Sequence, residues 1–421
     1  MPAAPSSDIP LFDDNALADP YPLYERLREV GPAVRLTRYG VWAIPRHREA
    51  EAILRNPDAY GSEDGVALTT LANTQILTGT VLASDAEQHI RLRRVLSAQL
   101  APRAIRRLVG VVTARAERLV EEHIAEGGFD AAALAQHMVS DTVMELMGLP
   151  EETREYLLTG AAATFDVFGP DNERYQRALP VASRMVEFLH EAVTRETVAP
   201  GSWMGAIFQA VDEGRMEEKA AIPLASAYTA ASMDTTILGI TEVIAQLARH
   251  PRQYEQLRRE PAHATSAFHE SIRLEAPIQG FGRMVTKTVE IGGVRLEAGE
   301  QVWLLYGSAG RDRLSWGPTA DVFNVRRRRA DRHLAFGGGP HLCAGIPLAE
   351  LQARAVLRAL ATRCTRLTIA GEPVRVLNNL LRGWGHMPVA VEHAPRAVSR
   401  TADDATYVRT PANADEQGAI S

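Results

Sequence analysis

The chain has 421 residues, 46% of them hydrophobic, and its 46 Lys and Arg against 52 Asp and Glu give a formal net charge of −6. This mildly acidic composition argues against nucleic-acid binding, for which proteins are usually basic. Two cysteines exclude a disulfide scaffold and a four-cysteine zinc site. Without a long uncharged apolar stretch or a secretory signal at the start of the chain, we expect no membrane segment and a cytoplasmic protein.

In chain order, the first segment is residues 1–8, which are polar and rich in small residues and are expected to be flexible. Residues 34–44 alternate in polarity around a Tyr39-Gly40 turn and predict two short strands. Apolar residues then recur every three or four positions in segments that predict long helices, namely 103–126, 224–249 and 253–275.

A second β region covers residues 288–305, where two strands are joined at Gly292-Gly293. The last predicted long helix spans 345–362, and the polar tail from 395 to 421 is expected to be disordered. The sequence therefore predicts one mainly α domain over residues 9–394, with a minor β portion.

The most informative segment is Phe336–Gly345, which reads FGGGPHLCAG. Three glycines before Cys343 allow the backbone to fold tightly around the sulfur, and a predicted helix begins directly after it. The amide groups and dipole at a helix N-terminus favour a thiolate, and a thiolate held in a rigid loop suits the axial position of a haem iron. The alternative is a buried structural cysteine, as for Cys364.

This segment resembles the haem-binding signature of the cytochrome P-450 family. The signature spans ten positions, and each of its elements is present in Phe336, Gly337, Gly339, His341, Cys343 and Gly345. The resemblance extends from about Asp19 to about Val391. It implies a single-domain, mainly α fold with a minor β portion, a bound haem b with Cys343 as the iron ligand, and insertion of one oxygen atom of O2 into a C–H bond.

Glu270 and Arg273 match the Glu-x-x-Arg motif of the same family. Residues three positions apart share one helix face and can pair, although such pairs are also common on protein surfaces. In the family they form a structural ion pair that is completed by a basic residue ahead of the cysteine loop. The spacing after Phe323 favours Arg327 for that position.

Residues 231–236 (ASMDTT) resemble the family's oxygen-binding motif, small-Gly-x-acid-Thr, at which a long helix opens beside the haem. The resemblance implies that Thr235 hydrogen-bonds the bound oxygen and that Asp234 relays protons from solvent. The alternative is a helix cap or a solvated face. The chain departs from the motif at Ser232, where the family usually has glycine, and the effect of this hydroxyl on the oxygen chemistry stays open.

Four basic residues fall at the family's positions for anchoring the haem propionates. His89 and Arg93 lie one turn apart on a predicted helix, and Arg283 and His341 complete the set. Phe336 also counts among the cofactor-binding residues by resemblance. Each of these residues alone is more often a surface or core residue than a ligand contact.

Within the family, the chain most resembles bacterial enzymes that oxidise para-substituted benzoates. Phe165, Phe168 and Phe281 fall where those relatives line the substrate pocket with aromatic rings, which would clamp a flat substrate. The alternative is that all three are ordinary core phenylalanines.

The carboxylate clamp of those relatives is not matched, because Ile76 and Gly79 stand at one of its positions. At the other, on the oxygen-binding helix, the chain offers Ser226, Ala227 and Ala230. A buried carboxylate without partners is unfavourable, so we expect a neutral aromatic substrate such as a methoxyphenol or alkylphenol. Hydroxyl contacts to it are expected from Tyr228, Thr229, Thr78 and Thr80.

The function predicted from the sequence is therefore O2-dependent hydroxylation or O-demethylation of a small neutral aromatic compound. Electrons would come from a ferredoxin and its NAD(P)H-dependent reductase. An acidic ferredoxin would be attracted by Arg91, Arg94 and Arg326–Arg329. The arginine run is equally consistent with a solvated patch. The alternatives are a hydroxylase of a para-substituted benzoate or of a terpenoid or polyketide in secondary metabolism, a peroxide-driven enzyme, and a haem-thiolate sensor or carrier. Asp234 and Thr235 count against the last two, which need no proton relay.

Overall fold

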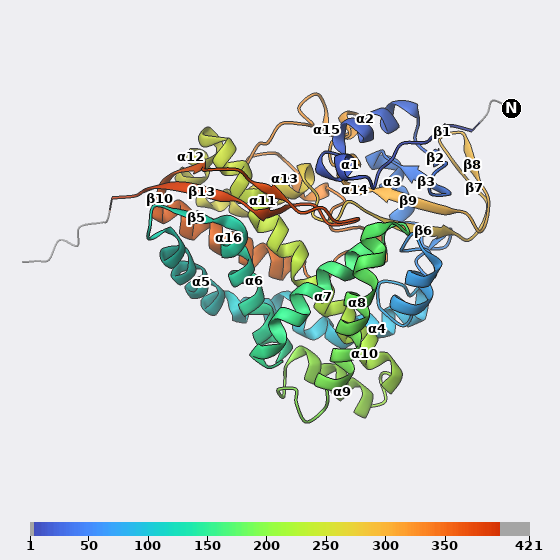
Figure 1. Cartoon of the computed structure of the whole chain (residues 1–421), viewed down its shortest axis with the longest axis horizontal. Helices are drawn as coiled ribbons and strands as arrows, with labels where there is room; N and C mark the ends of the chain where they lie inside the picture. Colours follow the sequence, from blue (N-terminus) through green and yellow to red (C-terminus); the bar gives the residue numbers. More distant parts are fainter. Residues whose placement is uncertain (1–3, 396–421) are drawn as a thin grey trace, which may run out of the picture.

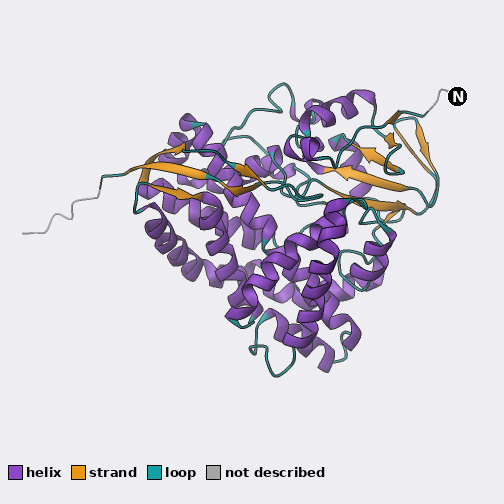
Figure 2. Cartoon of the chain, viewed as in Figure 1, coloured by secondary structure: helices purple, strands orange, loops and turns teal. Residues whose placement is uncertain are grey.

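Helices dominate the computed structural model, which describes residues 4–395 (Figures 1 and 2). The helices are α1 (Asp14–Ala18), α2 (Tyr21–Val30), α3 (His47–Leu54), α4 (Ala86–Leu100), α5 (Pro102–Ile124), α6 (Ala131–Met147), α7 (Arg154–Val167), α8 (Glu173–Ala192), α9 (Trp203–Asp212), α10 (Ala221–Ser232), α11 (Asp234–Arg249), α12 (Pro251–Arg259), α13 (Ala264–Leu274), α14 (Tyr306–Ala309), α15 (Arg313–Trp316) and α16 (Ile346–Arg363). The strands are β1 (Ser6–Ser7), β2 (Val34–Leu36), β3 (Val41–Ile44), β4 (Tyr60–Gly61), β5 (Gly128–Asp130), β6 (Gly280–Val285), β7 (Val289–Ile291), β8 (Val294–Leu296), β9 (Gln301–Leu305), β10 (Cys364–Ile369), β11 (Val374–Arg375), β12 (Trp384–His386) and β13 (Pro388–His393).

The molecule is triangular in outline, and the two larger sheets lie toward opposite upper corners of the view (Figure 1). The largest sheet has the strand order β1-β2-β3-β9-β6-β4, and the second has the order β10-β13-β5. Helices fill the space between and below the sheets (Figure 2). The mainly α fold with a minor β portion that the sequence predicts is therefore confirmed.

Both predicted β regions are present. Strands β2 and β3 pair antiparallel around Gly40, and β7 and β8 pair antiparallel around Gly292 and Gly293. All three glycines have positive φ angles, between +55° and +83°, which glycine adopts at no steric cost. The glycines of the sequence thus mark the turns correctly.

The N-terminal prediction needs a correction. Residues 1–8 were expected to be flexible, but Ser6 and Ser7 form strand β1, which pairs in parallel with Arg35 and Leu36. The paired backbone groups hold this segment at the sheet edge, which its polar sequence does not reveal. The predicted tail, 395–421, lies outside the described residues except for Pro395.

Two of the predicted helices agree closely with α5 and α16, and two are interrupted. The segment 224–249 forms α10 and α11, which are separated at Met233, where φ is −100° and ψ is −78°. The segment 253–275 forms α12 and α13, separated at Glu260. Glu260 precedes Pro261, and the residue before a proline is disfavoured in the helical region, which explains the second break.

Helix α11 lies at the centre of the molecule, and every residue from Thr236 to Ala248 is buried. It packs against α6, α13 and α16. Neighbouring positions Ile237 and Leu238 belong to the two different hydrophobic core clusters, so this helix separates them. Most of these buried residues are apolar, as expected of a helix at such a central position, and the buried Glu242 is paired with Gln246, Arg249 and Arg375.

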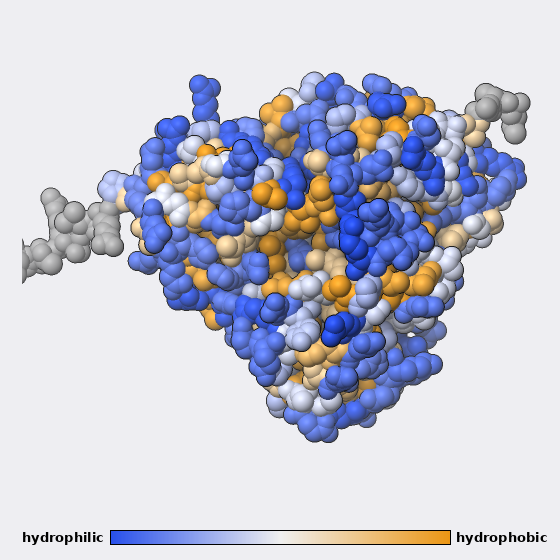
Figure 3. All heavy atoms as spheres, viewed as in Figure 1, coloured by the Kyte–Doolittle hydropathy of each residue, from blue (hydrophilic) through white to orange (hydrophobic). Residues whose placement is uncertain are grey.

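Hydrophilic residues cover most of the face shown in Figure 3, and apolar residues gather toward its middle. No helix in the described part of the chain is long and apolar enough to cross a membrane.

Candidate functional site

The cysteine loop is shaped by two glycines in the left-handed region. Gly337 and Gly339 have φ angles of +69° and +60°. At Gly339 a Cβ atom would lie 2.0 Å from the carbonyl oxygen of Leu54, so no other residue fits without moving the backbone. The loop closes through a hydrogen bond of 2.9 Å from the Cys343 amide to the Phe336 carbonyl.

Backbone donors point at the sulfur of Cys343. The Gly345 amide lies 3.3 Å from Sγ, and helix α16 begins one residue later. Burial raises the pKa of the Cys343 thiol, whereas the amides of Gly345 and Ile346 and the charge of Arg93 oppose that rise. The residue nevertheless keeps accessible surface, unlike Cys364, which is fully buried. An accessible sulfur surrounded by donors suits a metal-ligating thiolate better than a structural thiol.

A basic cluster lies beside the cysteine loop. The rings of His89 and His341 are 4.2 Å apart, and an Arg93 guanidinium nitrogen donates to the Leu342 carbonyl within the loop. Burial first, and then the charges of His341 and Arg93, lower the pKa of His89 to about 4. Arg283 is buried, and its charge also lowers the pKa of both histidines. The four predicted anchors are thus brought together.

Asp85 belongs to this cluster and was missed by the sequence analysis. Its carboxylate accepts the amides of Ser62 and Glu63 at 2.7 and 2.9 Å and lies 3.6 Å from Nε2 of His341. These hydrogen bonds contribute to a lowered pKa of Asp85 against the effect of its burial. The signal in the sequence is its place directly ahead of the α4 helix, where capping carboxylates are common.

Haem b fits the residues around Cys343. One acid faces four basic side chains, and the Nε2 atom of His89 is buried without a hydrogen-bond partner in the structure. Like charges gathered in a partly buried place are unfavourable unless an anion joins them. The two propionate groups of haem b would supply that negative charge, and the sulfur of Cys343 could ligate its iron.

The predicted ion pair is present and fully buried. Arg273 donates to both carboxylate oxygens of Glu270, at 2.7 and 2.9 Å, and neither side chain is exposed. Arg327 donates to Glu270 at 2.7 Å, as predicted, and also to the carbonyls of Thr319 and Val322. These bonds fix the end of α13 to the segment that leads into the cysteine loop.

The helix interruption at Met233 carries the predicted acid and hydroxyl. The Thr235 hydroxyl donates to the Ala231 carbonyl at 3.0 Å across the break. Oδ2 of Asp234 is buried without a hydrogen-bond partner, and burial raises the pKa of this carboxyl to about 7. The hydroxyl of Ser232 donates to the Thr229 carbonyl at 3.2 Å, so it is directed back into helix α10.

The three predicted pocket phenylalanines form one group. The ring centroids of Phe165 and Phe168 are 6.0 Å apart, and those of Phe168 and Phe281 are 6.4 Å apart. All three pack in the hydrophobic core beside the largest sheet, Phe281 being only partly buried. Ala230 is buried in α10, four residues before Asp234.

A hydrogen-bonded turn holds the aromatic group, and sequence analysis did not identify it. The backbone amide of Asn379 donates to the Asp166 carboxylate at 2.7 Å, and the side-chain amide of Asn379 donates to the backbone carbonyl of Asp166 at 2.9 Å. Asp166 stands between Phe165 and Phe168 on the last turn of α7. Burial raises the pKa of its carboxyl to about 6.

The expected hydroxyl contacts from α10 and the preceding loop are used inside the protein. The hydroxyls of Thr229 and Thr80 donate to the carbonyls of Ala225 and Leu77, at 2.8 and 2.6 Å, and both residues are buried. Tyr228 lies close enough to Arg93 and Cys343 for their charges to affect the pKa of its hydroxyl, and its ring packs edge-on against Trp203. These side chains therefore make contacts within the protein that support the structure around the site.

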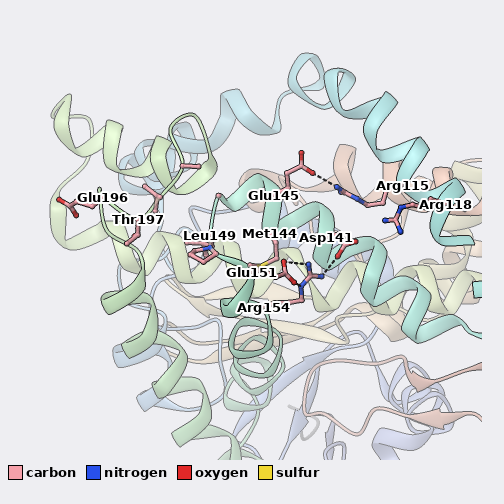
Figure 4. A pocket seen from close by; sticks show the side chains of 14 residues that line it. Arg115, Arg118, Asp141, Met144, Glu145, Leu149, Glu151, Arg154, Glu196 and Thr197 are labelled. Carbon is pink, nitrogen blue, oxygen red and sulfur yellow. Dashed lines mark hydrogen bonds and ion pairs between the residues drawn. The ribbon is translucent and has the colours of Figure 1, made fainter. Parts of the chain in front are cut away.

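A separate cleft of about 750 Å³ lies between α5, α6 and the segments that follow α6 and α8 (Figure 4). Its charged side chains pair with one another, since Arg115 contacts Glu145 and Arg154 contacts both Asp141 and Glu151. These pairs leave little uncompensated charge to attract a ligand, and the cleft does not include the residues around Cys343.

The helical fold and the glycine-shaped cysteine loop define a haem-thiolate protein, and comparisons with known proteins agree. The family model for cytochrome P450 matches residues 203–380. Cytochrome p450 CYP199A2 of Rhodopseudomonas palustris is 35% identical over 394 residues, covering 93% of this chain and 95% of that protein. The monooxygenase PikC of Streptomyces venezuelae is 30% identical over 411 residues, covering 94% and 97%.

The structure of Mycobacterium smegmatis CYP164A2 in its ligand-free state matches this one with a TM-score of 0.82 at 26% identity, covering 90% of this chain and 98% of that one. The chain therefore belongs to the cytochrome P450 family. It is a monooxygenase whose cofactor is haem b.

We predict that Arg327→Ala lowers haem incorporation and that Arg273→Ala lowers it further. Each change leaves the buried Glu270 carboxylate short of a donor, at a cost of about 3–5 kcal/mol for a broken buried pair. The haem-to-protein ratio of the purified variants measures the effect. Arg326→Ala is the matched control, because its side chain contacts Glu260 at the surface. Equal haem content in Arg327→Ala and Arg326→Ala would contradict a structural role of the pair.

We predict that Asp234→Asn stabilises the protein at pH 8 more than at pH 6. The folded pKa of Asp234 is raised from 3.8 to about 7, so the folded state holds a proton that the unfolded state has released. The free energy of unfolding therefore falls as pH rises from about 4 to 7, and the amide variant escapes this loss. Thermal unfolding at both pH values measures it, with the exposed Asp58→Asn as control. A shift in Tm that is independent of pH would show that Asp234 ionises as an ordinary carboxyl.

Proposed function

We propose that this cytochrome P450 hydroxylates or O-demethylates a small neutral aromatic compound, with Cys343 as the ligand of the haem iron. One observation carries the choice of a neutral substrate. The two segments that meet at the start of α10, residues 66–80 and 221–232, contain no charged side chain. Gly79 of the first segment lies against Pro223 of the second, where a Cβ would be 3.6 Å from the proline ring.

Haem b would be held by the residues of the cysteine loop and the basic cluster. Cys343 would ligate the iron, and His89, Arg93, Arg283 and His341 would bind the propionates. Phe336 would pack at the loop's first position, where its carbonyl already accepts the Cys343 amide. When bound, the haem supplies activation of O2 and transfer of one oxygen atom to a C–H bond.

Asp234 and Thr235 would handle the protons that this reaction consumes. A carboxyl with a pKa of about 7 exchanges its proton readily at neutral pH, which suits a general acid. The hydroxyl of Thr235 replaces a backbone donor at the Ala231 carbonyl and so stabilises the opened helix. From that position it can pass a proton onward. The hydroxyl of Ser232 is engaged by the Thr229 carbonyl, so it would add no free donor to this path.

The aromatic group would orient the substrate. A flat ring gains contact with the faces and edges of Phe165, Phe168 and Phe281, an arrangement that favours aromatic pairs. The tie between Asp166 and Asn379 keeps two of these rings in register. A substrate carboxylate would meet no cationic partner in residues 66–80 or in α10, and an unpaired buried charge is costly.

A ferredoxin would supply electrons at an arginine-rich surface. Fewer arginines are available on this surface than the sequence indicated. Arg326 pairs with Glu260, and Arg327 is committed to Glu270, so neither is free to meet a partner. Arg91 and Arg94 of α4 are exposed, as are Arg328 and Arg329. This remaining positive surface supports an acidic electron donor.

We predict that Thr235→Ala consumes NAD(P)H without matching product and releases hydrogen peroxide. Removal of the hydroxyl removes both a proton donor and the bond that stabilises the helix opening. Product and peroxide per NAD(P)H consumed are measured with a surrogate ferredoxin and reductase. Thr241→Ala serves as the control, because Thr241 makes the same type of bond to the Ile237 carbonyl in the same helix but away from the opening. Coupling that equals the wild-type value would contradict the assignment.

We predict that a methoxyphenol shifts the ferric Soret band from its low-spin to its high-spin position and that 4-methoxybenzoate of similar size does not. The phenol loses little on entering an uncharged pocket, whereas the carboxylate loses its hydration without gaining a partner. A spectral titration of the purified haem protein with each ligand separates the two cases. A tight shift with the benzoate would place the enzyme functionally with para-substituted-benzoate oxidisers.

A further inference from the structure

Behind the cysteine loop, two histidines and a glutamate form a buried chain of hydrogen bonds. Nδ1 of His269 lies 3.0 Å from Nε2 of His333, and Nε2 of His269 lies 2.7 Å from the carboxylate of Glu350. At the other end, Nδ1 of His333 receives the backbone amide of Ala335 at 3.1 Å. The two histidines are 6% and 4% exposed, so water does not compete for these bonds.

The chemistry of the two ends fixes the direction of every bond in the chain. An amide can only donate, so Nδ1 of His333 accepts, and its proton lies on Nε2. That proton is donated to Nδ1 of His269, which leaves the proton of His269 on Nε2, where it is donated to the Glu350 carboxylate. Both rings are therefore neutral, and each holds one defined tautomer.

The surroundings favour the neutral ring of His333. Burial first, and then the positive charge of Arg273, lower the pKa of His333 well below its ordinary value. His47 acts in the same direction. A proton added to either ring would place two donors opposite each other somewhere in the chain. The chain of hydrogen bonds is therefore intact only while both imidazole rings are neutral.

The chain connects three segments that meet around Cys343. His269 belongs to α13, which also carries the buried ion pair, and Glu350 belongs to α16, which begins just after the cysteine. The ring of Phe336 packs against both histidines, with its centroid 5.8 Å from that of His269 and 5.3 Å from that of His333. The Phe336 carbonyl in turn accepts the Cys343 amide. Two short steps thus lead from His333 to the backbone of the proposed iron ligand.

We propose that His333 and His269 are positioning residues that hold the entrance of the cysteine loop, and that Glu350 locks them in the tautomers this requires. The proposal rests on the proposed role of Cys343 as the iron ligand. By anchoring the Ala335 amide and enclosing the Phe336 ring, the chain keeps the loop closed around the sulfur and preserves the amide donors that stabilise the thiolate. A loosened loop would lose the thiolate ligand more readily.

Amide side chains allow the two bonds of His333 to be removed one at a time. In His333→Asn the side-chain oxygen stands near the position of Nδ1 and can still accept the Ala335 amide. In His333→Gln the side-chain nitrogen stands near the position of Nε2 and can still donate to His269. Glu350→Gln keeps an acceptor for His269 but removes the charge that fixes its tautomer.

The readout is the ferrous carbon-monoxide spectrum, which distinguishes thiolate-ligated haem from haem that has lost the thiolate, followed over time in mild denaturant. We expect His333→Gln to lose the thiolate form about tenfold faster than the wild type, because a buried amide loses its partner. His333→Asn should remain closer to the wild type, and Glu350→Gln should show a severalfold increase. The ferric reduction potential should change in the same order.

His123→Gln is the matched control, since His123 and His137 form an imidazole pair of the same length, 3.0 Å, on α5 and α6. Wild-type rates and potentials in all three test variants would overturn the proposal. If the His333 variants fail to fold, Glu350→Gln decides the matter, because Glu350 is partly exposed at the rim. A wild-type protein without the thiolate-type spectrum would instead contradict the assignment of Cys343, and Cys343→Ser would confirm that distinction.

Discussion

A carboxylate with no exposed surface, that of Glu270, organises one side of this enzyme. A buried charge is tolerated only if donors surround it, and Glu270 receives two hydrogen bonds from Arg273, one from Arg327 and one from the Asn324 amide. Arg273 in turn donates further N–H groups to the carbonyls of Gly310 and Ala320. Satisfying one acid thus draws three separate segments onto helix α13. The chain then enters the cysteine loop from a fixed point.

Helix α13 connects this ion-pair network to the cysteine loop, because different residues of the helix contact the two. One face carries the ion pair, and the residues just before it, Phe268 and His269, enclose the ring of Phe336. The loop is closed by its own amide–carbonyl bond, and at Gly339 a Cβ would lie 2.0 Å from the Leu54 carbonyl oxygen, so no larger residue fits there. Charge pairing therefore fixes the segment that leads into the loop, and aromatic packing and backbone geometry act on the loop itself. The stiffness of the loop follows from their agreement rather than from any single contact.

Local patterns in the sequence predicted those features whose cause is itself local. Glycines marked the hairpin turns and the cysteine loop, and spacing on one helix paired Glu270 with Arg273. The interruption at Met233 was implied only by resemblance, since the apolar pattern of 224–249 reads as continuous. Contacts such as that of Asp166 with Asn379 join residues 213 positions apart, and periodicity carries no information about them. Strand β1 and the commitment of Arg326 to Glu260 were hidden for the same reason.

The two sides of the site differ in charge, and this difference constrains what each can bind. Beside the loop, burial first and then the neighbouring basic groups lower the pKa of His89 to about 4, and an anionic group placed there would offset the effect of the basic groups. Around the helix opening, the ionisable group Asp234 has no partner for its buried oxygen, and its pKa rises to about 7. A second anion there would raise that pKa further, so that Asp234 would hold more tightly the proton it is proposed to deliver. The proposed neutral substrate would leave Asp234 free to exchange its proton, so the proposed proton chemistry and the proposed choice of substrate would both depend on the absence of charge in residues 66–80 and 221–232.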